Sequence, residues 1–273
     1  MRCSIGALTY CARSREGEGA VPRDTPSAPL IEVFPSFQGE GPRAGEAMLF
    51  VRVAGCPLRC NYCDTSYSYH AGESFRLHDW HGDVTSELGN PVAAAELLEQ
   101  VPAELVSGVG WLALTGGEPL LYGEFVRALF ERARARGLST LLESAALDAE
   151  ALRTVLPMTD HAALDFKLPS ALSGEDHRDA HVACIEAAVA SDTETAVKIV
   201  LTAAVEDHEW REALRLLSGF RDVMTLVVQP VTPALRERRS APPAAIVARA
   251  REAIAASFRV LVLPQTHKQV GVM

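Results

Sequence analysis

Three cysteines lie close together in the segment GCPLRCNYCDTSYS at residues 55–68. Cys56 and Cys60 are four positions apart, and Cys63 follows three positions later. Three thiolates at this spacing on a loop can bind three iron atoms of a 4Fe–4S cluster. Because the segment contains no fourth cysteine, one iron would stay open to a small molecule, as a cluster that takes part in chemistry requires.

A structural zinc site is the alternative interpretation of these cysteines. Zinc in such sites takes four protein ligands, and His70 or Asp64 could supply the fourth. The spacing C-x3-C-x2-C, with an aromatic residue between the last two cysteines, favours the iron–sulfur cluster. The glycine-rich TGGEP turn at residues 115–119 adds to that interpretation.

The elements that must position this loop alternate between strands and helices. Leu49, Val51 and Val53 predict a strand that runs directly into the loop. From residue 91 onward, apolar runs and amphipathic runs alternate, which is typical of a parallel sheet covered by helices. About seven strands in one series are too few for a closed eight-unit barrel. We therefore expect an α/β fold, an incomplete, open (β/α) barrel with a mostly parallel sheet.

Polar residues follow the expected strands at the points where the strands end. In open and barrel-like parallel sheets the ligand site lies at the carboxyl ends of the strands. We therefore expect one shared pocket that combines the cysteine loop with the other polar strand ends, which are residues 115–119, 143–144, 165–167, 229–232 and 264–268.

Composition limits the other possibilities. The 273 residues include 26 Lys and Arg against 35 Asp and Glu, for a formal charge of −9, and no basic stripe suggests a nucleic-acid partner. No apolar run is long enough to indicate a membrane span or a signal peptide, so we expect a cytoplasmic protein without a membrane partner. Residues 1–29 are rich in Gly, Pro and charge and predict a disordered leader, and residues 30–273 predict a single domain.

The other cysteines fit the same picture. Six cysteines in a cytoplasmic chain of this length indicate metal-binding or catalytic thiols more readily than a disulfide framework. Cys3, Cys11 and Cys184 have no partner at ligand spacing, so we expect each to be structural or incidental.

The cysteine motif and the TGGEP turn together resemble the radical S-adenosylmethionine (SAM) superfamily, whose GGE turn receives the methionyl amino group. Three further segments narrow the resemblance to the 7-carboxy-7-deazaguanine synthase family of queuosine and 7-deazapurine biosynthesis. They are FPSFQGEGPRAGEAMLFVRVAGC before the cluster, CDTSYS at its end and PQTHKQVGVM at the C-terminus. The resemblance covers residues 31–273 and is sharpest at residues 33–70 and 260–273.

This resemblance implies a homodimeric carbon–nitrogen lyase with a 4Fe–4S cluster, SAM, Mg²⁺ and an electron donor such as flavodoxin or ferredoxin. An electron from the cluster would cleave SAM, and the resulting 5′-deoxyadenosyl radical would abstract hydrogen from 6-carboxy-5,6,7,8-tetrahydropterin. The pterin would contract to 7-carboxy-7-deazaguanine with loss of ammonia. No catalytic group is expected beyond the radical, and the protein would orient the reactants and exclude water and oxygen.

The resemblance also implies roles for individual residues. Cys56, Cys60 and Cys63 would bind the cluster, and Thr65 would offer Mg²⁺ a hard oxygen ligand. Arg52 would bind the substrate carboxylate, because a planar guanidinium matches it better than lysine does. The full set implied for the substrate is Phe37, Gln38, Gly39, Glu40, Arg52, Thr115, Glu143, His267 and the terminal Met273.

The positions implied for SAM match the family less closely. The family usually carries Asn-Gly after the residue equivalent to Glu143, where this chain has Ser144 and Ala145. It also carries Pro-Ser-Ser-Gly after the lysine, where this chain reads LPSALSG. The implied SAM contacts are Tyr62, Asp64, Gly117, Asp165, Phe166, Lys167, Gln229, Pro230, Val231 and Thr232.

Two other functions remain open from the sequence. A small radical SAM activase that makes a glycyl radical on a large partner would share the cysteines and the GGE turn. It is not expected to carry the Q-G-E-G run or the terminal H-K-x-x-G. A zinc- or cluster-binding module without enzymatic activity would need only the cysteines, and the many polar strand ends argue against it.

Overall fold

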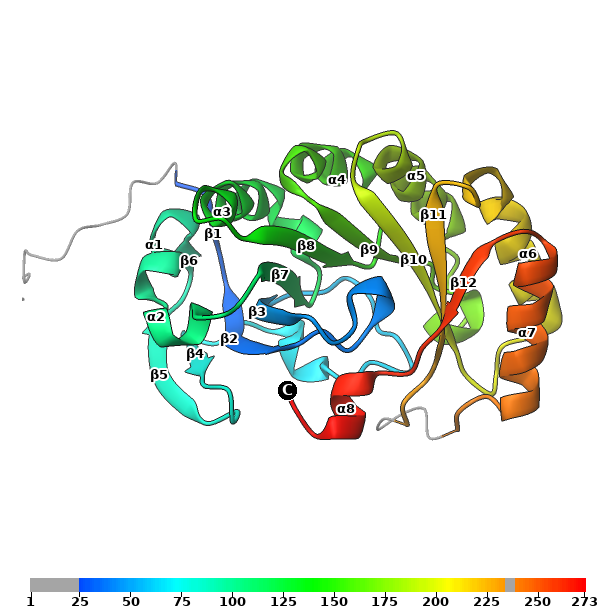
Figure 1. The fold of residues 1–273 in the computed structure, drawn as a ribbon, viewed down its shortest axis with the longest axis horizontal. Helices are drawn as coiled ribbons and strands as arrows, with labels where there is room; N and C mark the ends of the chain where they lie inside the picture. Colours follow the sequence, from blue (N-terminus) through cyan, green and yellow to red (C-terminus); the bar gives the residue numbers. More distant parts are fainter. Residues whose placement is uncertain (1–24, 234–238) are drawn as a thin grey trace, which may run out of the picture.

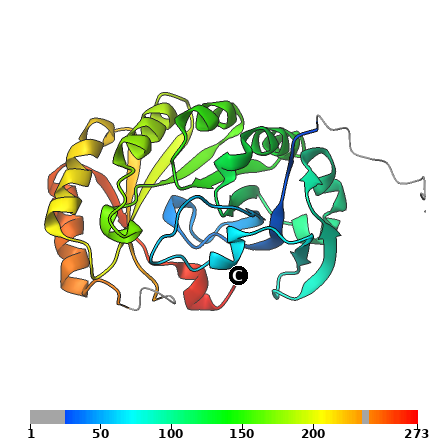
Figure 2. The same cartoon turned by 180° about the vertical axis from the view of Figure 1, so that it is seen from behind.

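The computed structural model describes residues 25–233 and 239–273. Within these residues the main element is a curved ten-stranded sheet in the order β12-β11-β10-β9-β8-β7-β3-β2-β4-β5. Helices cover its outer, convex side, and the C-terminal segment lies on the concave side (Figure 1 and Figure 2). The strands of this sheet are β2 (Leu30–Phe37), β3 (Ala47–Val53), β4 (Ser74–His78), β5 (Val84–Gly89), β7 (Trp111–Gly116), β8 (Ser139–Ser144), β9 (His161–Asp165), β10 (Glu194–Leu201), β11 (Met224–Pro230) and β12 (Arg259–Val262).

Seven strands of the sheet, β3 and β7 to β12, run parallel to one another. They are the seven apolar strands expected from the sequence. The two edge strands, β12 and β5, do not pair with each other, so the sheet stays open. The expected α/β fold with an incomplete, mostly parallel barrel is therefore confirmed.

The crossover helices begin at local sequence signals. The Asp148 side chain accepts hydrogen bonds from two N–H groups in the first turn of α4, and Glu206 forms a capping box with Glu209 at the start of α6. None of the helices in the described part of the chain is long and apolar enough to cross a membrane. The helices are α1 (Ala94–Gln100), α2 (Ala103–Val106), α3 (Gly123–Ala135), α4 (Ala149–Val155), α5 (Arg178–Val189), α6 (Asp207–Leu217), α7 (Pro243–Ala255) and α8 (Thr266–Val270), with 3-10 turns η1 (Gly41–Arg43), η2 (Ser66–Tyr69), η3 (Pro119–Tyr122), η4 (Leu156–Met158), η5 (Pro169–Leu172) and η6 (Ser218–Phe220).

The sequence pattern did not reveal the strands β4 and β5, which extend the sheet beyond β2. They form an antiparallel hairpin, and β4 pairs in parallel with β2. The predicted leader at residues 1–29 also needs correction. Its residues 1–24 lie outside the described part of the chain, but β1 (Ser27–Ala28) pairs with β6 (Val92–Ala93). Ala28 is fully buried, so the domain begins before residue 30.

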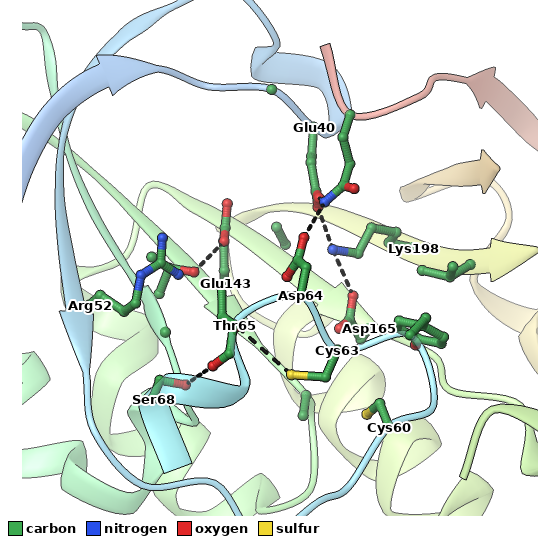
Figure 3. Close-up of a pocket in the computed structure, with 18 of the residues that line it drawn as sticks. Glu40, Arg52, Cys60, Cys63, Asp64, Thr65, Ser68, Glu143, Asp165 and Lys198 are labelled. Atoms are coloured by element: carbon green, nitrogen blue, oxygen red, sulfur yellow. Dashed lines mark hydrogen bonds and ion pairs between the residues drawn. The ribbon is translucent and has the colours of Figure 1, made fainter. Parts of the chain in front are cut away.

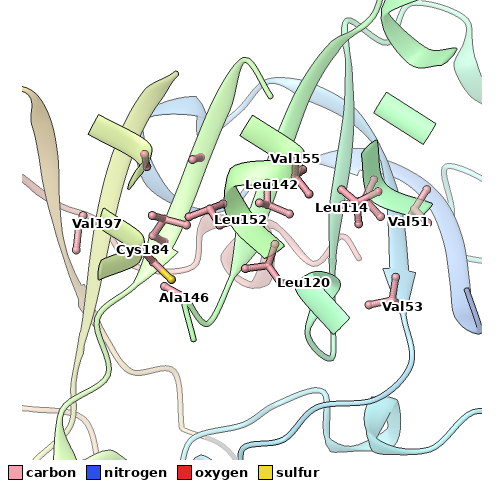
Figure 4. Packing of buried hydrophobic residues seen from close by; sticks show 14 of the residues in the cluster. Val51, Val53, Leu114, Leu120, Leu142, Ala146, Leu152, Val155, Cys184 and Val197 are labelled. Atoms are coloured by element: carbon pink, nitrogen blue, oxygen red, sulfur yellow. The ribbon is translucent and has the colours of Figure 1, made fainter. Parts of the chain in front are cut away.

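The two faces of the sheet have different surroundings, as β3 illustrates. Leu49, Val51 and Val53 point outward into the large apolar core between the sheet and the helices, part of which is shown in Figure 4. Met48 and Phe50 point inward into a small apolar cluster inside the partial barrel. Because side chains alternate along a strand, one short segment contributes both to the core and to the interior of the barrel.

Candidate active site

One cavity lies on the concave side at the carboxyl ends of the parallel strands, as expected. Every residue that the family resemblance implied for metal, substrate or SAM lines this cavity, except Phe166 and Pro230. Phe166 is buried in the outer core and packs against the ring of His181, with ring centroids 5.4 Å apart. The strand-end positions Asp165 and Lys167 face the cavity, so the alternation of the backbone directs Phe166 away from it.

The cysteine loop is held in place by backbone contacts on both sides. The N–H of Gly55 donates to the carbonyl of Ser68 (2.8 Å), and the N–H of Asn61 donates to the carbonyl of Ala171 (2.9 Å). A Cβ atom on Gly117 would lie 1.9 Å from the carbonyl oxygen of Gly55, so the TGGEP turn can approach the loop only with glycine there. The close fit fixes the loop against the end of β7.

The three thiols share an apolar surrounding. Cys60 is buried, Cys56 and Cys63 are half-buried, and all three pack with Leu58 and Leu172. Burial raises the pKa of the Cys56 and Cys60 thiols. Metal ligation binds the thiolate and would offset that shift.

The side chains around the three cysteines favour one of the two metal centres that the sequence allows, a 4Fe–4S cluster or a single zinc ion. Within residues 25–233 and 239–273, no three His, Cys, Asp or Glu side chains gather closely enough to hold one metal ion. His70 does not line the cavity, and Asp64 forms an ion pair with Lys268, so neither is positioned as a fourth zinc ligand. A cluster takes its thiolates at separate iron corners. The loop therefore fits a three-cysteine iron–sulfur cluster better than a single zinc ion.

Largely half-buried ion pairs line the part of the cavity next to the cysteine loop. Asp165 pairs with Lys167 and lies 3.1 Å from the amine of Lys198, which also pairs with Glu40 (Figure 3). The side-chain amides of Gln229 and Gln265 donate to Glu40 at 3.1 and 2.8 Å. Burial acts to raise the pKa of Asp165, but the two lysines outweigh it and hold the pKa at about 2. This part of the cavity therefore keeps its charges at neutral pH.

A neighbouring part of the cavity carries a carboxylate whose hydrogen-bond partners are neutral. Glu143 accepts a hydrogen bond from the amide of Gln38 (2.9 Å) and one from the hydroxyl of Thr115 (2.5 Å). Burial, followed by the charge of Glu40, raises the pKa of Glu143. Gln38 also accepts from the backbone N–H of Glu40 (3.0 Å), so its amide orientation is defined. This edge can present both acceptors and donors to a polar ligand.

The C-terminal segment completes the cavity. The N–H of Thr266 donates to the carbonyl of Gly39 (2.9 Å), and the hydroxyl of Ser36 donates to the terminal Met273 carboxylate (2.6 Å). A Cβ atom on Gly39 would lie 1.8 Å from Nδ1 of His267, so the imidazole sits directly on this glycine. Burial lowers the pKa of His267. A neutral imidazole and a terminal carboxylate therefore face the same cavity.

Thr65 lies beside the cysteines on the same loop. Thr65 lines the cavity, its hydroxyl lies 3.9 Å from the sulfur of Cys63, and its carbonyl accepts from the hydroxyl of Ser68 (Figure 3). A hard cation in the cavity could use the Thr65 hydroxyl together with ligand oxygens.

The sequence analysis missed several lining residues. Lys198 interrupts an apolar strand, and that isolated charge was the available signal. Gln265 stands inside the PQTHK segment already recognised. Gly116 and Ser144 belong to the strand ends expected in the pocket, and the remaining missed residues are apolar, small or aromatic and carry no such signal: Phe34, Phe50, Ser68, Tyr69, Ala145, Ala163 and Val200.

Comparison with known proteins agrees with this geometry. Residues 50–217 match the model of the radical SAM superfamily. A 7-carboxy-7-deazaguanine synthase from Methanopyrus kandleri is 32% identical over 93% of this chain and 98% of its own length. The synthase from Geobacter sulfurreducens is 33% identical over 90% of this chain and 98% of its own. The crystal structure of QueE from Escherichia coli has the same fold, with a TM-score of 0.61 at 19% identity over 86% of this chain and 93% of that one.

Proposed function

The chain belongs to the radical SAM superfamily and, within it, to the 7-carboxy-7-deazaguanine synthase family, and we propose that its cavity converts 6-carboxy-5,6,7,8-tetrahydropterin to 7-carboxy-7-deazaguanine with loss of ammonia. The observation that carries this proposal is the composition of the cavity. Three cysteines occupy one end, and groups suited to a carboxylate and to an amide-like ring edge occupy the other. A purely structural metal site would not need the second set.

In this proposal Cys56, Cys60 and Cys63 hold the 4Fe–4S cluster. When bound, the cluster and SAM supply one-electron cleavage and hydrogen abstraction. SAM would lie along Tyr62, Gly117 and the buried ion pairs around Asp165. The apolar packing of the loop would exclude water from the reacting groups.

The other end of the cavity would bind the pterin. Arg52 lines the cavity and would pair with the substrate carboxylate through a forked contact. Glu143 would accept hydrogen bonds from the ring N–H and amino groups, with Gln38 fixing its orientation at 2.9 Å. His267 and the Met273 carboxylate would close the cavity over the substrate.

Thr65 would bind Mg²⁺ together with oxygen atoms of the substrate, because Mg²⁺ accepts few protein ligands and retains several waters. The homodimer, the flavodoxin or ferredoxin donor and the cytoplasmic location remain predictions of the sequence. Replacing Mg²⁺ by other cations would test this metal site. Another hard, oxygen-seeking cation should support turnover, and a chelator of Mg²⁺ should abolish turnover while the iron content stays unchanged.

The direct experiment is anaerobic reconstitution with iron and sulfide, followed by reductant, SAM, Mg²⁺ and the carboxytetrahydropterin. We expect 7-carboxy-7-deazaguanine and ammonia in equal amounts. Stoichiometric tetrahedral zinc, with neither SAM cleavage nor a deazaguanine product, would overturn the proposal. SAM cleavage without this product would instead keep the superfamily chemistry and reject the substrate.

Arg52→Lys tests the substrate end separately. A lysine keeps the positive charge but cannot form the forked contact, so substrate affinity should fall about tenfold or more while iron content stays unchanged. Equal substrate affinity in the variant would contradict the proposed role of Arg52.

A further inference from the structure

A cluster of polar side chains lies behind Arg52 and outside the lining of the cavity. Nε of Arg52 donates to one carboxylate oxygen of Glu32 (2.7 Å), and the hydroxyl of Tyr67 donates to the same oxygen (3.0 Å). Nε2 of His78 lies 3.4 Å from the other oxygen of Glu32, within ion-pair distance but without forming a hydrogen bond. The side chains of Arg52, Glu32 and His78 are only 14%, 10% and 9% exposed. Of the four, only Arg52 lines the cavity.

The sheet itself creates this contact. Glu32 on β2 stands opposite Arg52 on β3, and a β-bulge between Leu30 and Glu32 sets that register. Two positions further along β2, the ring centroid of Phe34 lies 5.4 Å from the guanidinium carbon of Arg52. Among the described residues, Glu32 receives the hydrogen bond from Nε, and the terminal nitrogens of Arg52 form none. The guanidinium is thus held at one edge and along one face, and its forked edge is left for a ligand.

His78 extends this support toward the C-terminus. Its Nδ1 lies 3.0 Å from the carbonyl of Gly82, and a carbonyl can only accept, so Nδ1 carries the hydrogen. Gly82 has a φ of +85°, and a Cβ atom there would lie 3.3 Å from the sulfur of Met273. The turn between β4 and β5 therefore contacts both the support of Arg52, through His78, and the terminal residue, through Gly82.

We propose that Glu32, backed by His78, is a positioning residue that aims Arg52 at the carboxylate of the substrate. This inference rests on the proposed function, in which Arg52 binds that carboxylate. Glu32 acts through its hydrogen-bond geometry, because the contact to Nε leaves the two terminal nitrogens directed at the cavity. A charge that merely neutralised Arg52 would not need this geometry.

Two conservative substitutions separate geometry from charge. Glu32→Gln keeps the length of the side chain and an acceptor for Nε but removes the charge. Glu32→Asp keeps the charge but shortens the side chain by one methylene. The readout is equilibrium binding of 6-carboxypterin and of pterin without the carboxyl group, measured by fluorescence with the reconstituted, SAM-loaded protein and no reductant. The matched control is Glu87→Asp, on an exposed carboxylate that pairs with Arg76 on the same hairpin.

We expect both the wild-type protein and Glu87→Asp to bind 6-carboxypterin at least about tenfold more tightly than pterin without the carboxyl group. Such a ratio corresponds to one good charge-assisted contact. Glu32→Asp should lose most of this preference and Glu32→Gln should keep most of it, with binding of the carboxyl-free pterin unchanged in both. His78→Phe should reduce the preference to a smaller extent. Thermal melting would confirm that each variant is folded.

Each outcome decides a separate point. Greater loss in Glu32→Gln than in Glu32→Asp would overturn the positioning role, and so would equal weakening of both pterins. Full preference in His78→Phe would remove His78 from the proposal. A wild-type protein without any preference for the carboxylated pterin would reject the role of Arg52 in the proposed function, and this inference with it.

Discussion

Two half-buried carboxylates at the ends of neighbouring strands show how differently the two halves of the cavity are built. Glu143 ends β8 among the neutral groups of Gln38 and Thr115, whereas Asp165 ends β9 between Lys167 and Lys198. Burial raises the pKa of Glu143, while the lysines hold the pKa of Asp165 at about 2 against the effect of burial. Both groups are half-buried, so the neighbours decide which carboxylate keeps its charge.

The difference has a functional meaning. The half next to the cysteines is a fixed arrangement of charges, suited to a charged cofactor that must not shift during the reaction. The half around Glu143 and Gln38 offers adjustable hydrogen bonds, suited to a polar ring whose protonation changes during the reaction. The two halves meet at Gln38, which contacts both Glu143 and the backbone of Glu40, so each substitution is judged by which half it changes most.

Removing one cysteine should have the largest effect, because it destroys the cofactor half as a chemical site. We expect Cys60→Ala to lose most of its reconstituted iron and all detectable SAM cleavage, since the cofactor carries the chemistry. Iron and sulfide content and 5′-deoxyadenosine formation are the measurements. The matched control is Cys184→Ala, a second buried cysteine that packs in the outer core and should keep its iron. Full iron content in Cys60→Ala would contradict the cluster site.

Breaking the half-buried ion pairs should have the next largest effect. Lys198→Met leaves Glu40 and Asp165 without a shared cation, and the loss should cost about 1–3 kcal/mol of unfolding free energy, between the values for exposed and buried pairs. The low pKa of Asp165 stabilises the fold above its unfolded value of 3.8, and this contribution is lost as pH falls toward 2. The difference between wild type and variant should therefore be largest near neutral pH and should narrow below about pH 4.

Urea unfolding at several pH values measures this difference. The control is Lys268→Met, which breaks the more exposed pair with Asp64 and should cost at most about 1 kcal/mol. Equal losses for Lys198→Met and Lys268→Met would show that burial does not strengthen the cofactor half.

Glu143→Gln tests the adjustable half. Because the pKa of Glu143 is raised in the folded protein, ionising this group lowers the unfolding free energy of the wild type as pH rises above the ordinary value of 4.5. The glutamine variant should therefore gain stability relative to wild type with increasing pH, and its affinity for the pterin should fall about tenfold because an acceptor is replaced by a donor. SAM cleavage should persist. Urea unfolding from pH 5 to 8 and pterin binding are the measurements, with exposed Glu87→Gln as the control. A stability difference independent of pH would contradict the prediction.

The same contrast explains what the sequence could predict. The cysteine motif lies within one short segment of the chain. A parallel sheet brings its polar strand ends together for any conformation of the connecting loops. Both rules work without knowing any contact between distant residues. They located most of the cavity, but Phe166 and Pro230 were placed there as well, because each motif was taken as a block and the alternation at the ends of β9 and β11 was not applied.

The missed features depend on contacts between distant segments. Lys198 and Glu40 are 158 residues apart, and only the folded sheet brings them together. The hairpin of β4 and β5 was not predicted because its residues are mostly polar and exposed, so the apolar pattern of its two strands is weak. Its importance comes from the contact between His78 and Glu32, which no local pattern indicates.

The smallest effect on stability is expected for a substitution at Ala146, in the turn that follows β8. Ala146 is fully buried there with a φ of +56°, in the left-handed region that costs a residue with a side chain about 1–2 kcal/mol. Ala146→Gly relieves this cost but loses a buried methyl group of about 0.8 kcal/mol and about 0.5–1 kcal/mol of chain entropy. The net change should lie within about 1 kcal/mol of zero.

The equally buried Ala133, inside helix α3, provides the comparison. Ala133→Gly has no strain to relieve, so it should lose about 1.5–2 kcal/mol of unfolding free energy by urea denaturation. Both variants should keep SAM cleavage and pterin binding, because neither alanine lines the cavity. Equal destabilisation of the two would show that the turn at Ala146 is unstrained. Loss of pterin binding in Ala146→Gly alone would show that the strained turn holds Glu143 in place, and that the two halves of the cavity are not independent.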